Sequence, residues 1–102
     1  FRPGQRYREA DPAMALGVFH SSEYPYVFGT TPELTRDWGA EDDRMTALMQ
    51  GCWIRFAMTG NPNGEGLPHW PLFDDGRPTV LELKPEPELV DVPRRAQLRF
   101  VA

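Results

Sequence analysis

"GAEDDRMTALMQGCWIRFAMTGNPNG", residues 39–64, is the longest regular pattern in the chain. Its apolar residues recur at the three- and four-residue spacing of one helix face: Met45, Leu48, Met49, Cys52, Trp53, Phe56 and Ala57. Three acidic residues open the stretch, where the helix dipole favours negative charge, and Gly60 followed by Pro62 is a typical helix end. The spacing therefore predicts an amphipathic helix, whose apolar stripe needs a partner surface that little else in this chain could supply.

Glycine and proline divide the rest of the chain into short pieces. Gly51 also interrupts the helical stretch, at a cost of roughly 1 kcal/mol relative to alanine, and close backbone packing would explain it. Four other segments carry a local pattern: a single helical turn or irregular piece over 23–28, a short strand over 79–83, a spacer of proline and acidic residues over 84–88, and a helix or strand over 93–101.

Length and punctuation together indicate part of a larger fold. The chain has 102 residues, enough for one small domain and too few for two, and 11 prolines and 9 glycines interrupt it. A self-sufficient domain of this size would show more regular periodicity. The chain also begins at Phe1 rather than at a methionine, which suggests processing, cleavage or an excised fragment.

Charge and motif content exclude several classes of function. The net charge is −4, and Arg94 and Arg95 are the only adjacent basic pair, so nucleic acid is not an expected partner. No stretch approaches the roughly 20 apolar residues that span a bilayer. Two histidines and one cysteine show no metal-ligand spacing, and no glycine-rich phosphate motif occurs. We therefore expect no metal, no cofactor and no membrane span.

The residues of a complete hydrolytic site are not present. The only serines are Ser21 and Ser22, and neither lies in a Gly-x-Ser-x-Gly elbow. Cys52 lies on the apolar stripe, where burial would raise the pKa of its thiol. His20 by itself is either a hydrogen-bonded structural residue or a general base, and His69 lies in a proline-bounded loop where exposure is expected.

Four segments, in order, resemble one family. "GVFHSSEYPYVFG", residues 17–29, resembles the block around the catalytic histidine of type-B carboxylesterases, the group that includes the cholinesterases; its usual form is Gly-x-x-His-Gly/Ala-x-Glu-Leu-Pro-Tyr-Val-Phe. The other three are "WIRFAMTGNPNG" (53–64), "LPHWPLFDD" (67–75) and "RPTVLEL" (77–83). Ser21 replaces the usual glycine or alanine and Tyr24 the usual leucine, changes that could alter the shape of the pocket wall.

The resemblance implies an α/β fold: the C-terminal part of an α/β-hydrolase, with a histidine loop, one long amphipathic helix and a short strand. Residues 1–102 would form the C-terminal segment of one domain whose remainder is absent from this chain, so the segment is not expected to be autonomous. The triad of this fold follows the chain order Ser, Asp or Glu, His. A C-terminal segment would hold the histidine alone, and the helix stripe would pack on a sheet supplied by absent residues.

The implied function is that of a serine carboxylic ester hydrolase in which His20 is the general acid and base. Its partners would be a small-molecule carboxylic ester and the upstream part of the same hydrolase, which supplies the nucleophile, the triad acid and the oxyanion hole. Glu23 could be the triad acid or a support that hydrogen-bonds the histidine loop, and the triad order favours support. Ser22 could face the substrate pocket.

Several residues also have purely structural interpretations. Phe19 is expected in the core, Trp53 and Phe56 in helix-to-sheet packing, and Trp70 as a cap over the same core. Two other functions stay open: a catalytically inactive relative that binds protein partners in adhesion, as some members of this family do, and a small autonomous binding module. The sequence does not decide between a secreted and a cytoplasmic protein.

Overall fold

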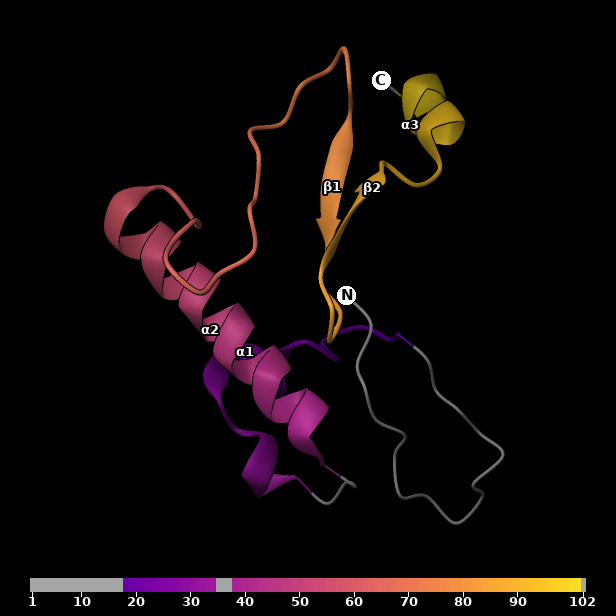
Figure 1. Ribbon diagram of the computed structural model, residues 1–102. Helices are drawn as coiled ribbons and strands as arrows, with labels where there is room; N and C mark the ends of the chain where they lie inside the picture. The colour runs from indigo at the N-terminus through magenta and orange to yellow at the C-terminus, as the bar shows by residue number, and fades with distance from the viewer. Residues whose placement is uncertain (1–17, 35–37, 102) are drawn as a thin grey trace.

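The computed structural model describes residues 18–34 and 38–101. Along the chain the elements are α1 (Tyr24–Phe28), a 3-10 helix η1 (Thr31–Glu33), α2 (Ala40–Thr59), β1 (Thr79–Glu82), β2 (Glu88–Asp91) and α3 (Arg95–Val101). Figure 1 shows α2 as a long rod on one side, the β1–β2 hairpin on the other, and α3 beside β2. Over the described residues, no helix has the length and apolar character needed to cross a bilayer.

Helix α2 confirms the prediction from periodicity. The backbone N–H of Gly39 donates to Asp42 Oδ2 at 3.0 Å, which satisfies a donor that the first helical turn would leave free. The helix ends at Gly60, which adopts φ 73° and donates its N–H to the Phe56 carbonyl at 2.7 Å. At Gly51 the close neighbour is a side chain rather than the expected backbone, because a Cβ there would lie 2.7 Å from Leu67 Cδ2. The Leu67 side chain of the loop after α2 therefore packs against the helix at Gly51.

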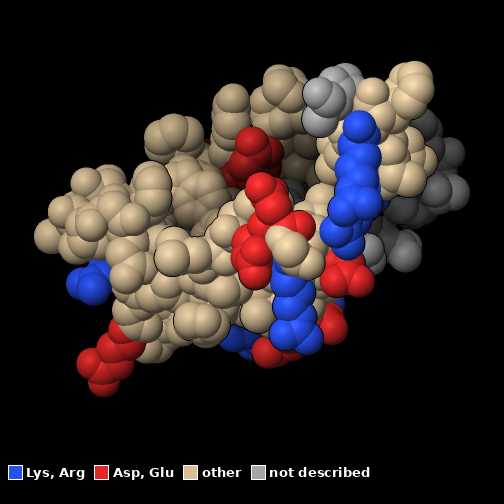
Figure 2. Space-filling model, turned by 90° about the horizontal axis from the view of Figure 1, so that it is seen from above, with Lys and Arg blue, Asp and Glu red and all other residues tan. Residues whose placement is uncertain are grey.

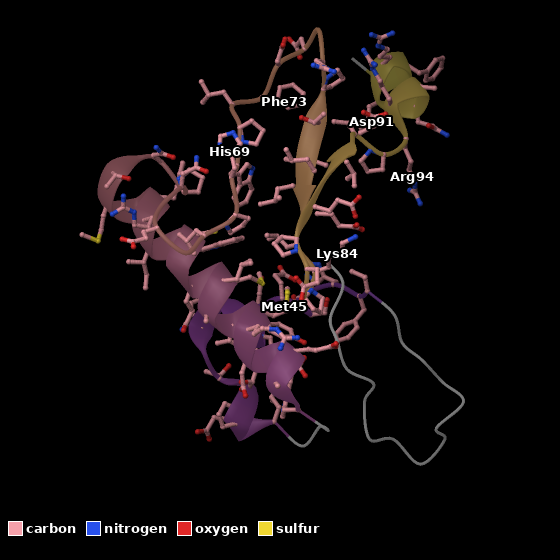
Figure 3. All side chains as sticks on the ribbon, viewed as in Figure 1. Met45, His69, Phe73, Lys84, Asp91 and Arg94 are labelled. Atoms are coloured by element: carbon pink, nitrogen blue, oxygen red, sulfur yellow. The ribbon has the colours of Figure 1, made fainter. Side chains whose placement is uncertain are left out.

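A small core joins α1, α2 and the hairpin. Its buried members are Tyr26, Met45, Met49, Leu81 and Leu83. Trp38 packs its ring edge-to-face on Tyr26 at a centroid distance of 5.6 Å. Figure 3 places Met45 between α2 and the end of the hairpin near Lys84. The core thus lies at the N-terminal half of α2.

The predicted spacer over 84–88 is the connection between two strands, and it ends one residue earlier than expected. Glu88 begins a second strand that pairs antiparallel with β1, with Thr79 opposite Asp91 and Glu82 opposite Glu88. The sequence of β2 has only two apolar residues between acidic ones, so it lacks a clear strand pattern, and pairing with β1 supplies the order. The ambiguous stretch 93–101 resolves as helix α3, from Arg95 to Val101.

The apolar stripe of α2 is only half covered. Met45, Met49 and Cys52 are buried, but Trp53 is 41% exposed and Phe56 59% exposed. Elsewhere on the surface, basic and acidic side chains are interspersed on the face drawn in Figure 2, and uncharged residues cover most of it. The C-terminal half of α2 therefore presents the unpartnered face that the sequence predicts.

Candidate active-site segment

His20 lies at the tip of a tight turn formed by Phe19, His20, Ser21 and Ser22, which we call the histidine turn. The Ser22 backbone N–H donates to the Phe19 carbonyl at 3.1 Å, and Ser21 adopts φ 67°. His20 does not have a positive φ, so a negative φ followed by a positive one gives the pattern of a type II turn. The His20 side chain is exposed, which leaves its imidazole open to a group from outside the described chain.

The histidine turn is continuous with a rigid anchor. The Tyr24 N–H donates to the Ser21 carbonyl at 3.2 Å, and α1 begins directly after Glu23 with Pro25 in its first turn. Two residues of this anchor, Pro25 and Tyr26, are buried. The helix stops at Gly29, which adopts φ 66°. An exposed histidine is thus held by a buried support rather than by a free loop.

A buried hydrogen bond connects this anchor to α2. Tyr26 Oη donates to Asp42 Oδ1 at 2.7 Å, and both residues are almost fully buried. The other oxygen of Asp42 accepts from Gly39 N, so one carboxylate satisfies two donors and ties α1 to the first turn of α2. This arrangement fixes the histidine turn relative to the long helix.

Ser22 and Glu23 follow His20 in different environments. Ser22 is 1% exposed, and its hydroxyl has no hydrogen-bond partner among the residues that the structure describes. Glu23 is half-buried, and its carbonyl accepts the Tyr26 and Val27 N–H groups at 3.0 and 3.1 Å. Its carboxylate makes no hydrogen bond within the described ranges. The roles of Ser22 in a pocket and of Glu23 as a support stay predictions.

The remaining candidates fall into structural positions. Burial raises the pKa of the Cys52 thiol, as predicted from its place on the apolar stripe. His69 is exposed, also as predicted, and Trp70 is half-buried against the core. Phe19 is half-buried rather than part of the core, because it opens the histidine turn at the surface. Within 18–34 and 38–101, no cluster of three or more metal-ligating side chains occurs.

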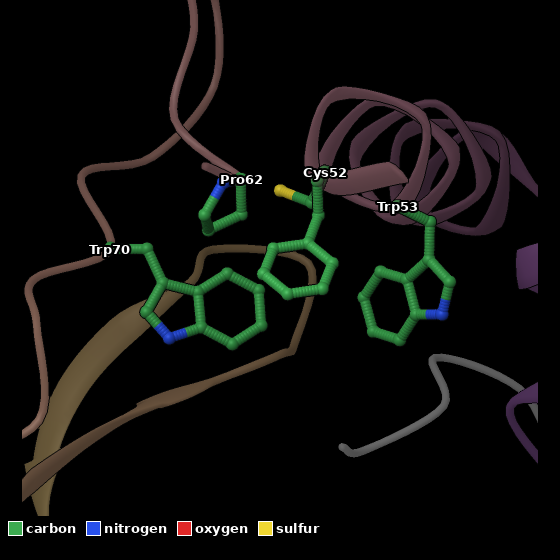
Figure 4. A pocket seen from close by; sticks show the side chains of 5 residues that line it. Cys52, Trp53, Pro62 and Trp70 are labelled. Carbon is green, nitrogen blue, oxygen red and sulfur yellow. The ribbon is translucent and has the colours of Figure 1, made fainter. Parts of the chain in front are cut away.

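An apolar pocket opens on the half-covered face of α2 (Figure 4). It has a volume of about 360 Å³ and is lined by Cys52, Trp53, Phe56, Pro62 and Trp70. The rings of Trp53 and Trp70 face across it with centroids 6.4 Å apart. The pocket has almost no polar lining groups, and its walls come from α2 and from the loop that follows it. It is therefore suited to burial by another apolar surface.

Asn63 holds the loop wall of this pocket. Its Nδ2 donates to the Trp70 carbonyl at 2.8 Å, and its Oδ1 accepts the Trp70 N–H at 2.6 Å. Asn61 Oδ1 accepts both the side-chain and the backbone N–H of Asn63. A single amide thus clamps the backbone of a tryptophan seven residues away. This clamp fixes the loop wall of the pocket opposite α2.

Sequence reasoning missed the supporting roles of Asp42 and Asn63. Asp42 is one of three consecutive acidic residues, and its position as the third residue of the helix is the only signal that could have distinguished it. Asn63 lies in a turn-rich connection where asparagine is common in any case. Asp42 depends on Tyr26, 16 positions away, and Asn63 on Trp70, seven positions away, so neither role follows from the local pattern.

Comparisons with known proteins agree on one family. The model of the "Carboxylesterase family" matches residues 2–101. Human cocaine esterase is 37% identical over 86 residues, which cover 79% of this chain and 14% of that protein. Rat carboxylesterase 1C is 47% identical over 55 residues, 54% of this chain and 10% of that protein.

A solved structure shows the same architecture. The structure of a PNB esterase superposes with a TM-score of 0.74 at 26% identity, and the match covers 95% of this chain and 20% of that one. The described elements are therefore part of an α/β-hydrolase fold, and the chain spans only about a fifth of that protein. With a family model matched over nearly its whole length, the chain belongs to the carboxylesterase family.

Proposed function

We propose that the intact protein is a serine carboxylic ester hydrolase in which His20 is the general acid and base. The observation that supports this is the placement of His20, exposed at the tip of a turn whose base is buried. A structural histidine would be expected to lie within the core, whereas a base that serves an outside hydroxyl must be open and held in place. The substrates would be small-molecule carboxylic esters.

The proposed proton transfers follow from that placement. A serine hydroxyl from another part of the hydrolase attacks the ester carbonyl carbon, and His20 accepts the hydroxyl proton. The tetrahedral intermediate then collapses, the bond to the alcohol oxygen breaks, and His20 returns the proton to the leaving alcohol. In the second half of the reaction, water attacks the acyl carbon and His20 accepts a proton from it. His20 then returns a proton to the serine oxygen as its bond to the acyl group breaks, and the carboxylic acid is released. An Asp or Glu outside this chain would orient the imidazole, and backbone N–H groups would bind the oxyanion.

The rest of the hydrolase would cover the apolar face of α2. Residues 1–102 would be the C-terminal segment of one domain. The relatives are long enough to contain the rest of that domain, since the chain spans only 14% of human cocaine esterase and 20% of the PNB esterase. The exposed parts of Trp53 and Phe56 are too apolar to favour contact with water, and their burial would stabilise the assembled domain by about 25 cal/mol per Å². A β-sheet face from the remainder would fill the pocket beside them.

Glu23 and Ser22 complete the proposed site. Glu23 would support the histidine turn, because it lies three residues after His20 at the N-cap of α1 and its carbonyl accepts the first hydrogen bonds of that helix. Ser22 would border the substrate pocket once the remainder of the domain is in place. Its buried hydroxyl has no partner within the described part of the chain, so it has hydrogen-bonding capacity to offer there.

The test is the His20→Ala variant of the intact protein, assayed on p-nitrophenyl esters. We expect kcat/KM to fall by about 10³- to 10⁵-fold, because triad members act as a unit. His69→Ala is the matched control, since His69 is also exposed but lies on the loop after α2. Near-normal turnover of His20→Ala would exclude this histidine from the mechanism. An intact wild-type protein with no ester turnover would instead favour the inactive adhesion relative.

A further inference from the structure

We infer that Ser21 is a positioning residue for His20, acting through its left-handed backbone conformation. The inference rests on the proposed function of His20. Ser21 and Arg94 are the two residues other than glycine with positive φ among those that the structure describes, at 67° and 56°. Such a conformation brings Cβ close to the backbone and costs roughly 1–2 kcal/mol for most residues. At Ser21 it occurs one residue after the proposed base.

The conformation sets the direction of the imidazole. A type II turn has positive φ at its third residue, whereas a negative φ there belongs to a type I turn, which makes the same bond from the fourth N–H to the first carbonyl with its central peptide turned over. Here that bond is Ser22 N–H to Phe19 C=O at 3.1 Å. If Ser21 moved to a negative φ, this bond could persist, but the peptide between His20 and Ser21 would turn over and ψ of His20 would change. Because the rotamers open to a side chain depend on its backbone angles, the direction of the imidazole would change with it.

The neighbours of Ser21 account for how the strain is maintained. On its C-terminal side, the Ser21 carbonyl accepts the Tyr24 N–H, and Ser22 is buried. Two residues beyond Tyr24 the chain is fixed by the Tyr26–Asp42 hydrogen bond. The turn is therefore determined by its anchor rather than by the intrinsic preference of serine, which is how strained residues persist at functional sites. The strain at Ser21 is the cost of presenting His20 outward.

The experiment compares two substitutions at Ser21 in the intact hydrolase. Valine is β-branched and strongly disfavours positive φ, whereas glycine adopts it freely. We expect Ser21→Val to lower kcat by about 10- to 100-fold, the scale of a misplacement near 1 Å, with KM changed less than about threefold. Ser21→Gly should exceed Ser21→Val by at least about tenfold in kcat. This rescue and the split between kcat and KM would not follow from a general loss of stability.

Arg94→Val is the matched control. Arg94 has the same backbone conformation but lies at the start of α3, far from α1 in the view of Figure 3. We expect the Arg94→Val variant to lose free energy of unfolding as Ser21→Val does, but to keep the kcat of the wild-type protein. Should Ser21→Val not fold, Ser21→Thr, which is also β-branched and keeps the hydroxyl, replaces it.

Two results separate this inference from the proposed function. Equal kcat for the valine and glycine variants, with His20→Ala inactive, would overturn the positioning role of Ser21 alone. Normal turnover in His20→Ala would overturn the proposed function itself. A parallel loss of kcat in Arg94→Val would also overturn the inference, because the effect would then be one of stability.

Discussion

Tyr26 Oη and Asp42 Oδ1 lie 2.7 Å apart in the core, and this hydrogen bond joins the short helix after His20 to the first turn of α2. Tyr26 is 0% exposed and Asp42 1% exposed, so neither can exchange its partner for water. A charge-assisted hydrogen bond in such a site is among the stronger polar interactions in proteins. The position of the histidine turn therefore depends on a contact between residues 16 positions apart.

Removal of this contact should destabilise the intact protein. Asp42→Ala removes the acceptor of both the Tyr26 hydroxyl and the Gly39 N–H, and we expect the free energy of unfolding to fall by about 2–6 kcal/mol, since the loss of each buried acceptor costs about 1–3 kcal/mol. Tyr26→Phe removes a single bond and should cost about 1–3 kcal/mol. Urea unfolding measures both.

Tyr24→Phe is the control for this pair, because Tyr24 is 52% exposed on the same helix. Its free energy of unfolding should change by less than about 0.5 kcal/mol. If Tyr24→Phe and Tyr26→Phe lowered the free energy of unfolding equally, the buried hydrogen bond of Tyr26 would not contribute to stability.

The Asn63 clamp should be sensitive to the loss of its donors. Asn63→Asp keeps an acceptor for the Trp70 N–H, but its side chain cannot donate to the Trp70 carbonyl or to Asn61 Oδ1. We expect the free energy of unfolding to fall by about 1–3 kcal/mol. The loss should be larger for Asn63→Ala, which also removes the acceptor of the Trp70 N–H. Hydrogen exchange at the Trp70 amide reports the loop directly. Unchanged protection of that amide in Asn63→Ala would contradict the clamp.

The Cys52 thiol should react slowly and depend on pH in a defined direction. Burial raises its pKa, so in the folded protein the reactive thiolate is less populated at any given pH than in the unfolded chain. For a neutral acid with a raised folded pKa, the stabilisation is full below the unfolded pKa and is lost as pH rises toward the folded value. Modification by an aromatic disulfide at pH 8 should therefore be slower in folded than in urea-unfolded protein.

Cys52→Ser identifies the signal of this thiol in the labelling experiment. The slow phase should disappear in that variant, and only reactions of other thiols should remain. A rapid reaction of Cys52 in the folded protein would mean that the apolar pocket beside it stays open in the assembled hydrolase.

The end of α2 should depend on the conformation of Gly60. Gly60 has φ 73°, and a Cβ there would meet no atom within 4 Å, so substitution acts through backbone strain alone. We expect Gly60→Ala to lower the free energy of unfolding by about 1 kcal/mol and Gly60→Asn to lower it less, because asparagine tolerates the left-handed region. The thermal midpoint of each variant checks the order. Equal midpoints would indicate that the helix end rearranges without cost.

The sequence by itself determined the long helix, its end at Gly60, the strand after Pro78 and the exposed character of His69, because each depends on local spacing or on a residue with one preferred conformation. It also carried the blocks that identify the carboxylesterase family, which the family model matches over residues 2–101. Strand β2 lay beyond this reach, because a strand of four residues without alternation exists only through its pairing with β1.

Only the tertiary structure decided how His20 is presented. The left-handed conformation of Ser21 and the burial of Asp42 have no local signal, since serine disfavours positive φ and aspartate is usually exposed. Asp42 is held by Tyr26, 16 positions away, and the turn that contains Ser21 leads directly into this anchor. Such contacts can outweigh intrinsic preferences of about 1–2 kcal/mol. Local patterns therefore define which elements form, whereas the orientation of the histidine follows from how those elements pack.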